Sequence, residues 1–138
     1  MSGSPLHISR RDDREAALAL LYEADMSGDS IDEVVLRNSA DIDDYSTQMV
    51  LGVDGLLDGI DEQIDAVAED WTVSRMPGID RSILRMSVWE LLSREDIPIT
   101  AVVSEAVALA NQYSTEKSAP FINGVLVKLA ELIRPEDD

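Results

Sequence analysis

The chain has 138 residues, of which 45% are hydrophobic and 28% charged, which allows one globular domain but not two independent cores. It has no cysteine, which excludes disulfides, thiolate catalysis and metal sites held by thiolates. The net charge of −17 opposes the binding of polyanions over most of the surface.

The first part of the sequence predicts a leader followed by two helices. Residues 1–9 are expected to form a flexible leader, and apolar residues at helical spacing predict a first helix over about residues 10–25. Ser30 and Glu33 form an S-x-x-E capping box, in which the two side chains satisfy free amides at a helix start. This capping box predicts a short second helix that ends at about Asn38.

The middle of the chain predicts three more helices. Two apolar stripes of different phase, the first from Tyr45 and the second ending at Trp71, predict a third and a fourth helix with a break near Gly59. Pro77 and Gly78 are the strongest interruption of the pattern. Residues 79–92 are apolar on more than one face, so the fifth helix is expected to be central and largely buried.

The last part predicts two further helices and an acidic tail. Pro98 precedes a sixth helix that runs to Tyr113, and Ser118 is expected to be the N-cap of a seventh that stops before Pro135. No segment shows the period-2 pattern of a strand, so the fold class is all-α, with about seven helices. Short connections favour a single domain over residues 10–135 made of two small bundles, about 10–59 and 60–134, with a tail over 136–138.

The acidic residues are concentrated in one half of the chain. Residues 15–70 contain sixteen acids and one base, Arg37, whereas residues 71–134 contain seven of each. An anionic ligand could therefore still meet the N-terminal arginines and the neutral half if the fold brings them together. No apolar run approaches a signal peptide or the roughly 20 residues of a membrane helix, so we expect a cytoplasmic protein with no membrane partner.

The residues needed for catalysis are largely missing. The single histidine, His7, lies in the expected leader, and neither a P-loop nor a G-x-G-x-x-G motif occurs. Carboxylate pairs such as Asp61 and Asp65 are interpreted as solvated helix faces. The sequence thus predicts a protein that is not an enzyme, with no catalytic residue, metal site or cofactor.

Three arginines surround the expected start of the first helix. Arg10, Arg11 and Arg14 could contact nucleic-acid phosphates and stack on unpaired bases, and Arg10 and Arg14 would share a helix face. The alternative is that they are solubilising charges near a terminus. Asp12 and Asp13 lie between them and cancel much of their field, so spacing alone leaves both interpretations open.

Several segments match a known family, in the family's order, between about residues 10 and 135. They are residues 14–25 (REAALALLYEAD), 80–85 (DRSILR), 89–91 (WEL), 97–98 (IP), 105–110 (EAVALA) and 121–126 (FINGVL), together with Trp71, Tyr113, Ser114 and Ser118. On these segments the chain resembles the NusB family. The resemblance implies an all-helical fold of two perpendicular bundles. It also implies a transcription antitermination factor that binds boxA-type RNA together with the small-subunit ribosomal protein NusE, within antitermination complexes on RNA polymerase, chiefly on ribosomal RNA operons.

The resemblance also implies an RNA surface in two parts. The arginine-rich motif of the family falls on Arg10, Arg11 and Arg14, and the start of the last helix supplies the second part, with Lys117, Ser118, Phe121 and Asn123. The chain departs from the family at Asp12, Asp13 and Pro120, where relatives often carry basic residues. From the residues themselves, Phe121 could instead belong to the core, Asn123 could cap a helix, and Gly124 could allow close helix packing.

The protein-partner surface implied by the resemblance includes Tyr22, Asp80, Arg81 and Arg85. Tyr22 could equally be a core residue with a solvated hydroxyl. Two other functions compete: a protein-only adaptor that binds NusE with weak or lost RNA binding, and an enzyme, because NusB-like domains also occur fused to RNA methyltransferases. The enzyme would need a large catalytic domain, for which the chain leaves no room. Whether the free protein is a monomer or a homodimer stays open.

Overall fold

The structure, a computed structural model, describes residues 6–69 and 71–136, with side chains from residue 10 onward. In this part it contains α-helices, one 3₁₀ turn and no strand, so the all-α prediction is confirmed. The elements are α1 (Leu6–Ser27), α2 (Ile31–Arg37), α3 (Asp44–Gly55), α4 (Leu57–Val67), η1 (Val73–Arg75), α5 (Gly78–Ser93), α6 (Ile99–Tyr113) and α7 (Ser118–Ile133).

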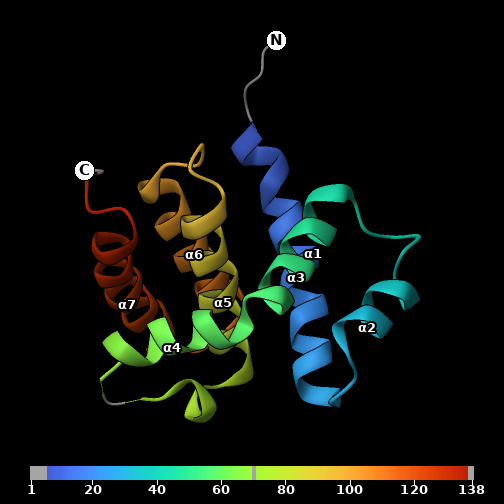
Figure 1. The fold of residues 1–138 in the computed structure, drawn as a ribbon, viewed down its shortest axis with the longest axis horizontal. Coiled ribbons are helices and arrows are strands. Elements are labelled where there is room, and N and C mark those ends of the chain that lie inside the picture. Colours follow the sequence, from blue (N-terminus) through green and yellow to red (C-terminus); the bar gives the residue numbers. More distant parts are fainter. Residues whose placement is uncertain (1–5, 70, 137–138) are drawn as a thin grey trace.

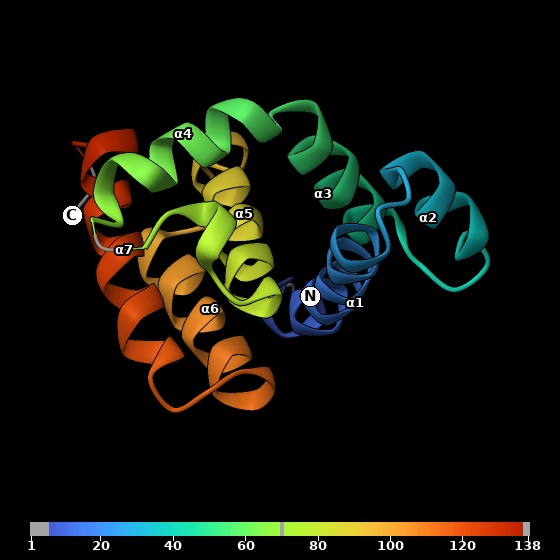
Figure 2. The same cartoon turned by 90° about the horizontal axis from the view of Figure 1, so that it is seen from below.

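Helix α5 is the centre of the molecule, as its apolar sequence predicts. It packs against α1 and α3 on one side, against α6 and α7 on the other, and against α4 (Figure 1). Seen from below, α1, α2 and α3 gather on one side and α5, α6 and α7 on the other, and α4 runs from one group to the other (Figure 2). Buried Leu, Ile, Val, Ala and Met residues of all seven α-helices join in one core. The division into bundles of residues 10–59 and 60–134 stays a prediction.

Two side-chain caps position helices in the acidic half. The Ser30 hydroxyl accepts the amide of Glu33 at 3.2 Å, and the Glu33 carboxylate accepts the amide of Ser30 at 3.1 Å, which confirms the predicted capping box of α2. Asp43 caps α3 by accepting the amide of Ser46 at 2.9 Å. Both caps satisfy amides that the first turn of a helix leaves without a partner.

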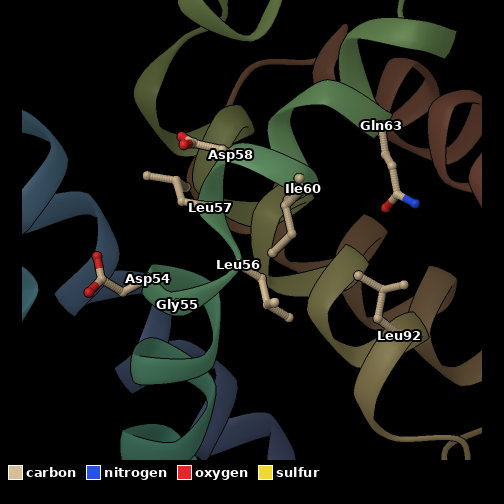
Figure 3. A pocket seen from close by; sticks show the side chains of 9 residues that line it. Asp54, Gly55, Leu56, Leu57, Asp58, Ile60, Gln63 and Leu92 are labelled. Atoms are coloured by element: carbon tan, nitrogen blue, oxygen red, sulfur yellow. The ribbon is translucent and has the colours of Figure 1, made fainter.

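The break between α3 and α4 lies at Leu56 (Figure 3), and not at the predicted Gly59, which is inside α4. Leu56 ends α3 and begins α4, with its amide donating to the carbonyls of Gly52 and Val53. The side chain of Leu56 is exposed, so the first apolar stripe ends at Val53, and Ile60 belongs to the second stripe alone. The change of buried face therefore comes one turn earlier than the glycine suggested.

Two other predicted boundaries also differ. Helix α1 begins at Leu6, so residues 6–9 of the expected leader are helical, while residues 1–5 lie outside the described residues. The N-cap of α7 is Lys117, not Ser118. The Ser118 side chain makes no cap on α7, and its hydroxyl donates to Asp80 at 2.8 Å.

Arg134 closes the other end of the core. It follows α7 and is buried, and its guanidinium donates to the carbonyls of Glu90, Leu91, Arg94 and Ile97 at 2.7–3.1 Å. These carbonyls belong to the last turn of α5 and the loop after it, and those of Glu90 and Arg94 also accept the amides of Arg94 and Ile97. One side chain thus fixes the end of α7 to the end of α5. No helix in the described part of the chain is long and apolar enough to cross a membrane.

Candidate nucleic-acid interface

Arg14 lies inside the molecule, and this corrects its prediction as an RNA contact. Its side chain is 2% exposed, and its Nε donates to both carboxylate oxygens of Glu90 at 3.1 and 3.0 Å. Glu90 is equally buried on α5. A buried guanidinium needs such a partner, because an unpaired charge inside a protein costs several kcal/mol. Arg14 therefore joins α1 to α5 and cannot reach a ligand outside.

The same carboxylate binds a third helix. The hydroxyl of Tyr45 on α3 donates to Glu90 at 2.6 Å, and burial and the charge of Glu90 raise the pKa of this tyrosine. The ring of Tyr45 lies edge-on to Trp89 with centroids 6.0 Å apart. This buried group of side chains fixes the start of α1, and with it the backbone that carries Arg10 and Arg11.

Arg10 and Arg11 remain at the surface, in two different settings. Arg11 is 58% exposed, and its guanidinium donates to both oxygens of Glu105 on α6 at 3.1 and 2.9 Å. Arg10 lies over the ring of Tyr45, with 3.8 Å from its central carbon to the ring centroid. Two cations are thus presented at one edge, and one of them is held by an acid.

The two aspartates of the arginine motif also differ. Asp12 is exposed, whereas Asp13 is partly buried and faces Asp43, the N-cap of α3. Burial, and then the hydrogen bond and charge of Asp43, raise the pKa of Asp13 from 3.8 to about 6. Asp13 therefore interacts mainly with α3, and it weakens the field of the arginines less than its position in the sequence suggests.

The second part of the predicted RNA surface, at the start of α7, also contains both exposed and buried residues. Lys117 and Asn123 are exposed, so both are accessible, and Asn123 is not a helix cap. Ser118 is 3% exposed and bound to Asp80, which excludes it from direct contact with a ligand. Phe121 is partly buried and packs edge-on against Trp71, with ring centroids 5.5 Å apart.

Helix α6 separates the two parts. Arg11 meets α6 at Glu105, and Lys117 follows the end of this helix at Tyr113. At 1.5 Å per residue, Glu105 and Tyr113 are about 12 Å apart along the axis. A strand with stacked bases, at ~3.4 Å each, would cover this distance in about four nucleotides.

Comparison with known proteins identifies the family. The family model described as "NusB family" matches residues 11–131. The chain belongs to the NusB family. It is 41% identical over 135 residues to the transcription antitermination protein NusB of Thermobifida fusca (strain YX), with 95% of each chain covered. It is 40% identical over 146 residues to the protein of the same description from Beutenbergia cavernae, with 94% of this chain and 95% of the relative covered.

Solved NusB structures share the fold. T. maritima NusB superposes with a TM-score of 0.82 at 28% identity, over 95% of this chain and 93% of the other. A chain in the crystal structure of antitermination factors NusB and NusE in complex with dsRNA superposes with a TM-score of 0.73 at 27% identity, over 89% and 96%. These matches establish a transcription antitermination protein of a non-enzymatic family with a NusB-like fold, as the sequence predicted.

The partner residues expected of a NusB family member are mostly engaged inside the molecule. Asp80 is 1% exposed and accepts hydrogen bonds from the hydroxyls of Ser114 and Ser118 at 2.5 and 2.8 Å. This burial corrects the prediction that Asp80 contacts a protein partner. Tyr22 is the most accessible of the four, at 36%, so it is not a core residue. Its ring lies against Gly78, where a Cβ would be 2.9 Å from it.

The two arginines predicted for the same surface are held by acids. Arg81 donates to Asp25 at 3.0 and 2.7 Å, and Arg85 donates to Asp61 at 2.9 and 2.8 Å. Only 15% of each side chain is exposed. A partner could reach their edges but would compete with a carboxylate for their donors.

Two further residues of this NusB-type surface, Trp71 and Lys128, were not predicted as site residues. Trp71 and Lys128 line a pocket with Lys117 and Phe121. Helical spacing could have indicated Lys128, which is seven residues after Phe121 and thus on the same face of α7. Glu105, the acid that holds Arg11, gave no local signal.

A pocket on another part of the molecule carries none of the predicted site residues. An open pocket of about 470 Å³ at the corner of α3 and α4, where Leu56, Ile60, Gln63 and Leu92 meet, contains none of them (Figure 3). In the described part of the chain, no group of three or more His, Asp or Glu side chains could hold a metal ion.

Proposed function

We propose that this NusB family protein binds single-stranded boxA-type RNA together with the ribosomal protein NusE, as part of an antitermination complex on RNA polymerase that supports ribosomal RNA transcription. The observation that carries the proposal is the pair of surface cations Arg10 and Arg11 on an otherwise strongly acidic protein. The solved relative that contains NusB, NusE and dsRNA supports NusE and RNA as partners. A role on nascent RNA in bacteria implies a cytoplasmic location.

The isolated chain is expected to bind RNA weakly. Arg11 must exchange a bidentate carboxylate for a phosphate, and Arg14 contributes nothing at the surface. Lys117, Phe121 and Asn123 would supply further contacts at the start of α7, about 12 Å away along α6. NusE would then add contacts that the acidic chain lacks, through a surface that includes Tyr22 and the edges of Arg81 and Arg85.

The test is a titration of fluorescently labelled boxA-type RNA with the chain alone and with its complex with NusE. The complex is expected to bind clearly more tightly than the chain alone. The double variant Arg10→Ala, Arg11→Ala should lower the affinity of the complex at least tenfold, because it removes two phosphate contacts. Arg37→Ala is the matched control, since Arg37 is an exposed arginine of α2 that pairs with Glu23 and Asp29.

A protein-only adaptor is the second candidate, favoured by the pairing of Arg11 with Glu105 and the burial of Arg14. In that case NusE binds the chain in a pull-down, but boxA RNA fails to bind the complex even at low salt. That combination of results would replace the first proposal with the second.

A further inference from the structure

A pocket of about 440 Å³ lies between the end of α4 and the first half of α7, which pack against each other. Trp71 and Phe121 form its aromatic wall, and Lys117, Lys128 and Glu69 are among its other lining residues. Its volume is in the range of small-ligand pockets. Lys117, Phe121 and Lys128 lie on one face of α7, because they are four and seven residues apart.

The aromatic wall is open to solvent. Trp71 is 45% exposed, whereas the other tryptophan, Trp89, is buried in the core. Phe121 meets Trp71 edge-on at an interplanar angle of 71°, an arrangement in which the pair keeps accessible ring surface for a third flat group. Nucleobases stack on such exposed aromatic side chains in many single-strand binding sites.

The two lysines of the chain flank these rings and are available for phosphates. Six arginines pair with acids: Arg11, Arg14, Arg37, Arg81, Arg85 and Arg94. Within the described residues, Lys117 and Lys128 are exposed and form no ion pair. Glu69 is the opposing charge at the pocket.

Gly124 leaves the pocket open. A Cβ at this position would meet nothing within 4 Å, so the glycine does not serve the close helix packing that the sequence suggested. Gly124 lies in α7 one turn after Phe121 and lines the pocket. Because glycine is unfavourable inside a helix, the residue lowers helix stability and leaves space where any side chain would project.

We propose that this pocket binds an unstacked nucleobase of single-stranded RNA against Trp71 and Phe121, with Lys117 and Lys128 contacting the flanking phosphates. The inference rests on the proposed RNA-binding function and adds Trp71, Lys128 and Gly124 to it. A base of double-stranded RNA cannot enter the pocket, because it would first have to leave its base pair and its stacked neighbours.

The experiment follows tryptophan fluorescence while a short single-stranded boxA-type RNA is added to the complex with NusE. RNA is expected to quench the emission of exposed Trp71, and the variant Trp71→Phe, in which the buried Trp89 is the only remaining tryptophan, should lose the quenching. Gly124→Leu should lower the affinity about tenfold by filling the pocket, since a base stacked on an aromatic ring contributes about that much or more. Its melting temperature should stay equal or rise, because leucine favours the helix.

Two charge variants of opposite sign provide the control. Lys128→Gln should weaken binding about threefold and make the salt dependence shallower, whereas Glu69→Gln should strengthen binding. A double-stranded RNA of the same sequence should not quench Trp71.

The outcomes separate this inference from the proposed function. If the complex binds RNA but Gly124→Leu binds equally well, the pocket assignment is wrong and the RNA-binding function stands. If Gly124→Leu weakens the binding of NusE and not of RNA, the pocket receives a protein and the inference is also wrong. If no RNA binds the wild-type complex, both proposals are wrong together.

Discussion

Asp13 of α1 and Asp43 of α3 form a contact that depends on pH. Burial and the neighbouring carboxylate raise the pKa of Asp13 to about 6, while Asp43 has its pKa lowered, first by its hydrogen bond with Asp13. The folded protein therefore holds a proton on Asp13 more tightly than the unfolded chain does. The stability that this proton brings is complete below about pH 4 and is lost as the pH rises through about 6.

Asp13→Asn is expected to stabilise the protein at high pH. An amide can donate the hydrogen bond of a protonated Asp13 at every pH, so the free energy of unfolding should rise by about 1–2 kcal/mol at pH 8, with partial solvent exposure reducing the effect. Near pH 4 the gain should be much smaller. Urea unfolding at both pH values measures it, with Asp12→Asn as the exposed neighbour of equal charge. An equal gain at both pH values would contradict the argument.

Glu105 competes with RNA for Arg11 in the proposed interface. Its carboxylate occupies the two donors that a phosphate would use, at 3.1 and 2.9 Å. Glu105→Gln is therefore expected to raise the affinity of the NusE complex for boxA RNA about threefold, measured by fluorescence anisotropy. Glu62→Gln, an exposed position on α4 with the same change in net charge, should have a much smaller effect. Equal gains in both variants would show an effect of net charge alone.

At the scale of single residues, the sequence predicted positions better than environments. Arg10 and Arg11 are at the surface, but Arg14 pairs with Glu90, 76 residues away, and Asp80 pairs with Ser118, 38 residues away. Arg14 and Asp80 look like exposed polar groups in their helices. Only the tertiary fold brings them to partners that allow their burial.

At the scale of the elements, α3 and α5 approach closely at Gly52. A Cβ there would lie 2.0 Å from Nε1 of Trp89, whose ring is buried. Gly52→Ala is expected to lower the free energy of unfolding by about 2–3 kcal/mol, because Trp89 has no room to move. Thermal unfolding followed by circular dichroism measures the change.

Gly59→Ala is the matched control in the next helix. A Cβ at Gly59 meets nothing within 4 Å, so this variant should gain about 0.5–1 kcal/mol from helix propensity. If both variants lose stability alike, the loss comes from the glycine backbone and not from contact with Trp89.

The presence of each helix could be predicted from the sequence, and so could most of the residues at which the helices begin and end. The capping box of Ser30 and Glu33 and the interruption at Pro77 are local signals, and the structure has both boundaries there. The break was predicted at Gly59 and not at Leu56 because glycine is a local signal too. Only the packing of Ile60 and Ile64 in the core decides at which turn the buried face of the helix changes. Ser118, a common N-cap residue, is likewise already inside α7, and its hydroxyl donates to Asp80.

At the scale of the whole molecule, net charge limits how RNA binding can respond to salt. Four phosphate contacts by Arg10, Arg11, Lys117 and Lys128 would give a slope of about −3 for the logarithm of affinity against the logarithm of salt concentration. Repulsion between RNA and a protein of net charge −17 weakens as salt rises, so the observed slope for the chain alone should be shallower than that. Titrations at several KCl concentrations give the slope. A steeper value would mean that phosphates touch the protein elsewhere.

Arg134 has a consequence for how the chain folds as it is synthesised. The guanidinium satisfies four carbonyls at the end of α5 and in the loop after it, although those residues leave the ribosome about 40 positions earlier. Helix α5 can form early, but the contacts of Arg134 with its last turn form only after residue 134 has emerged from the exit tunnel. The nascent protein therefore reaches its final packing late, and a ribosome paused before that codon holds a chain whose central helix is not yet fixed to the end of α7.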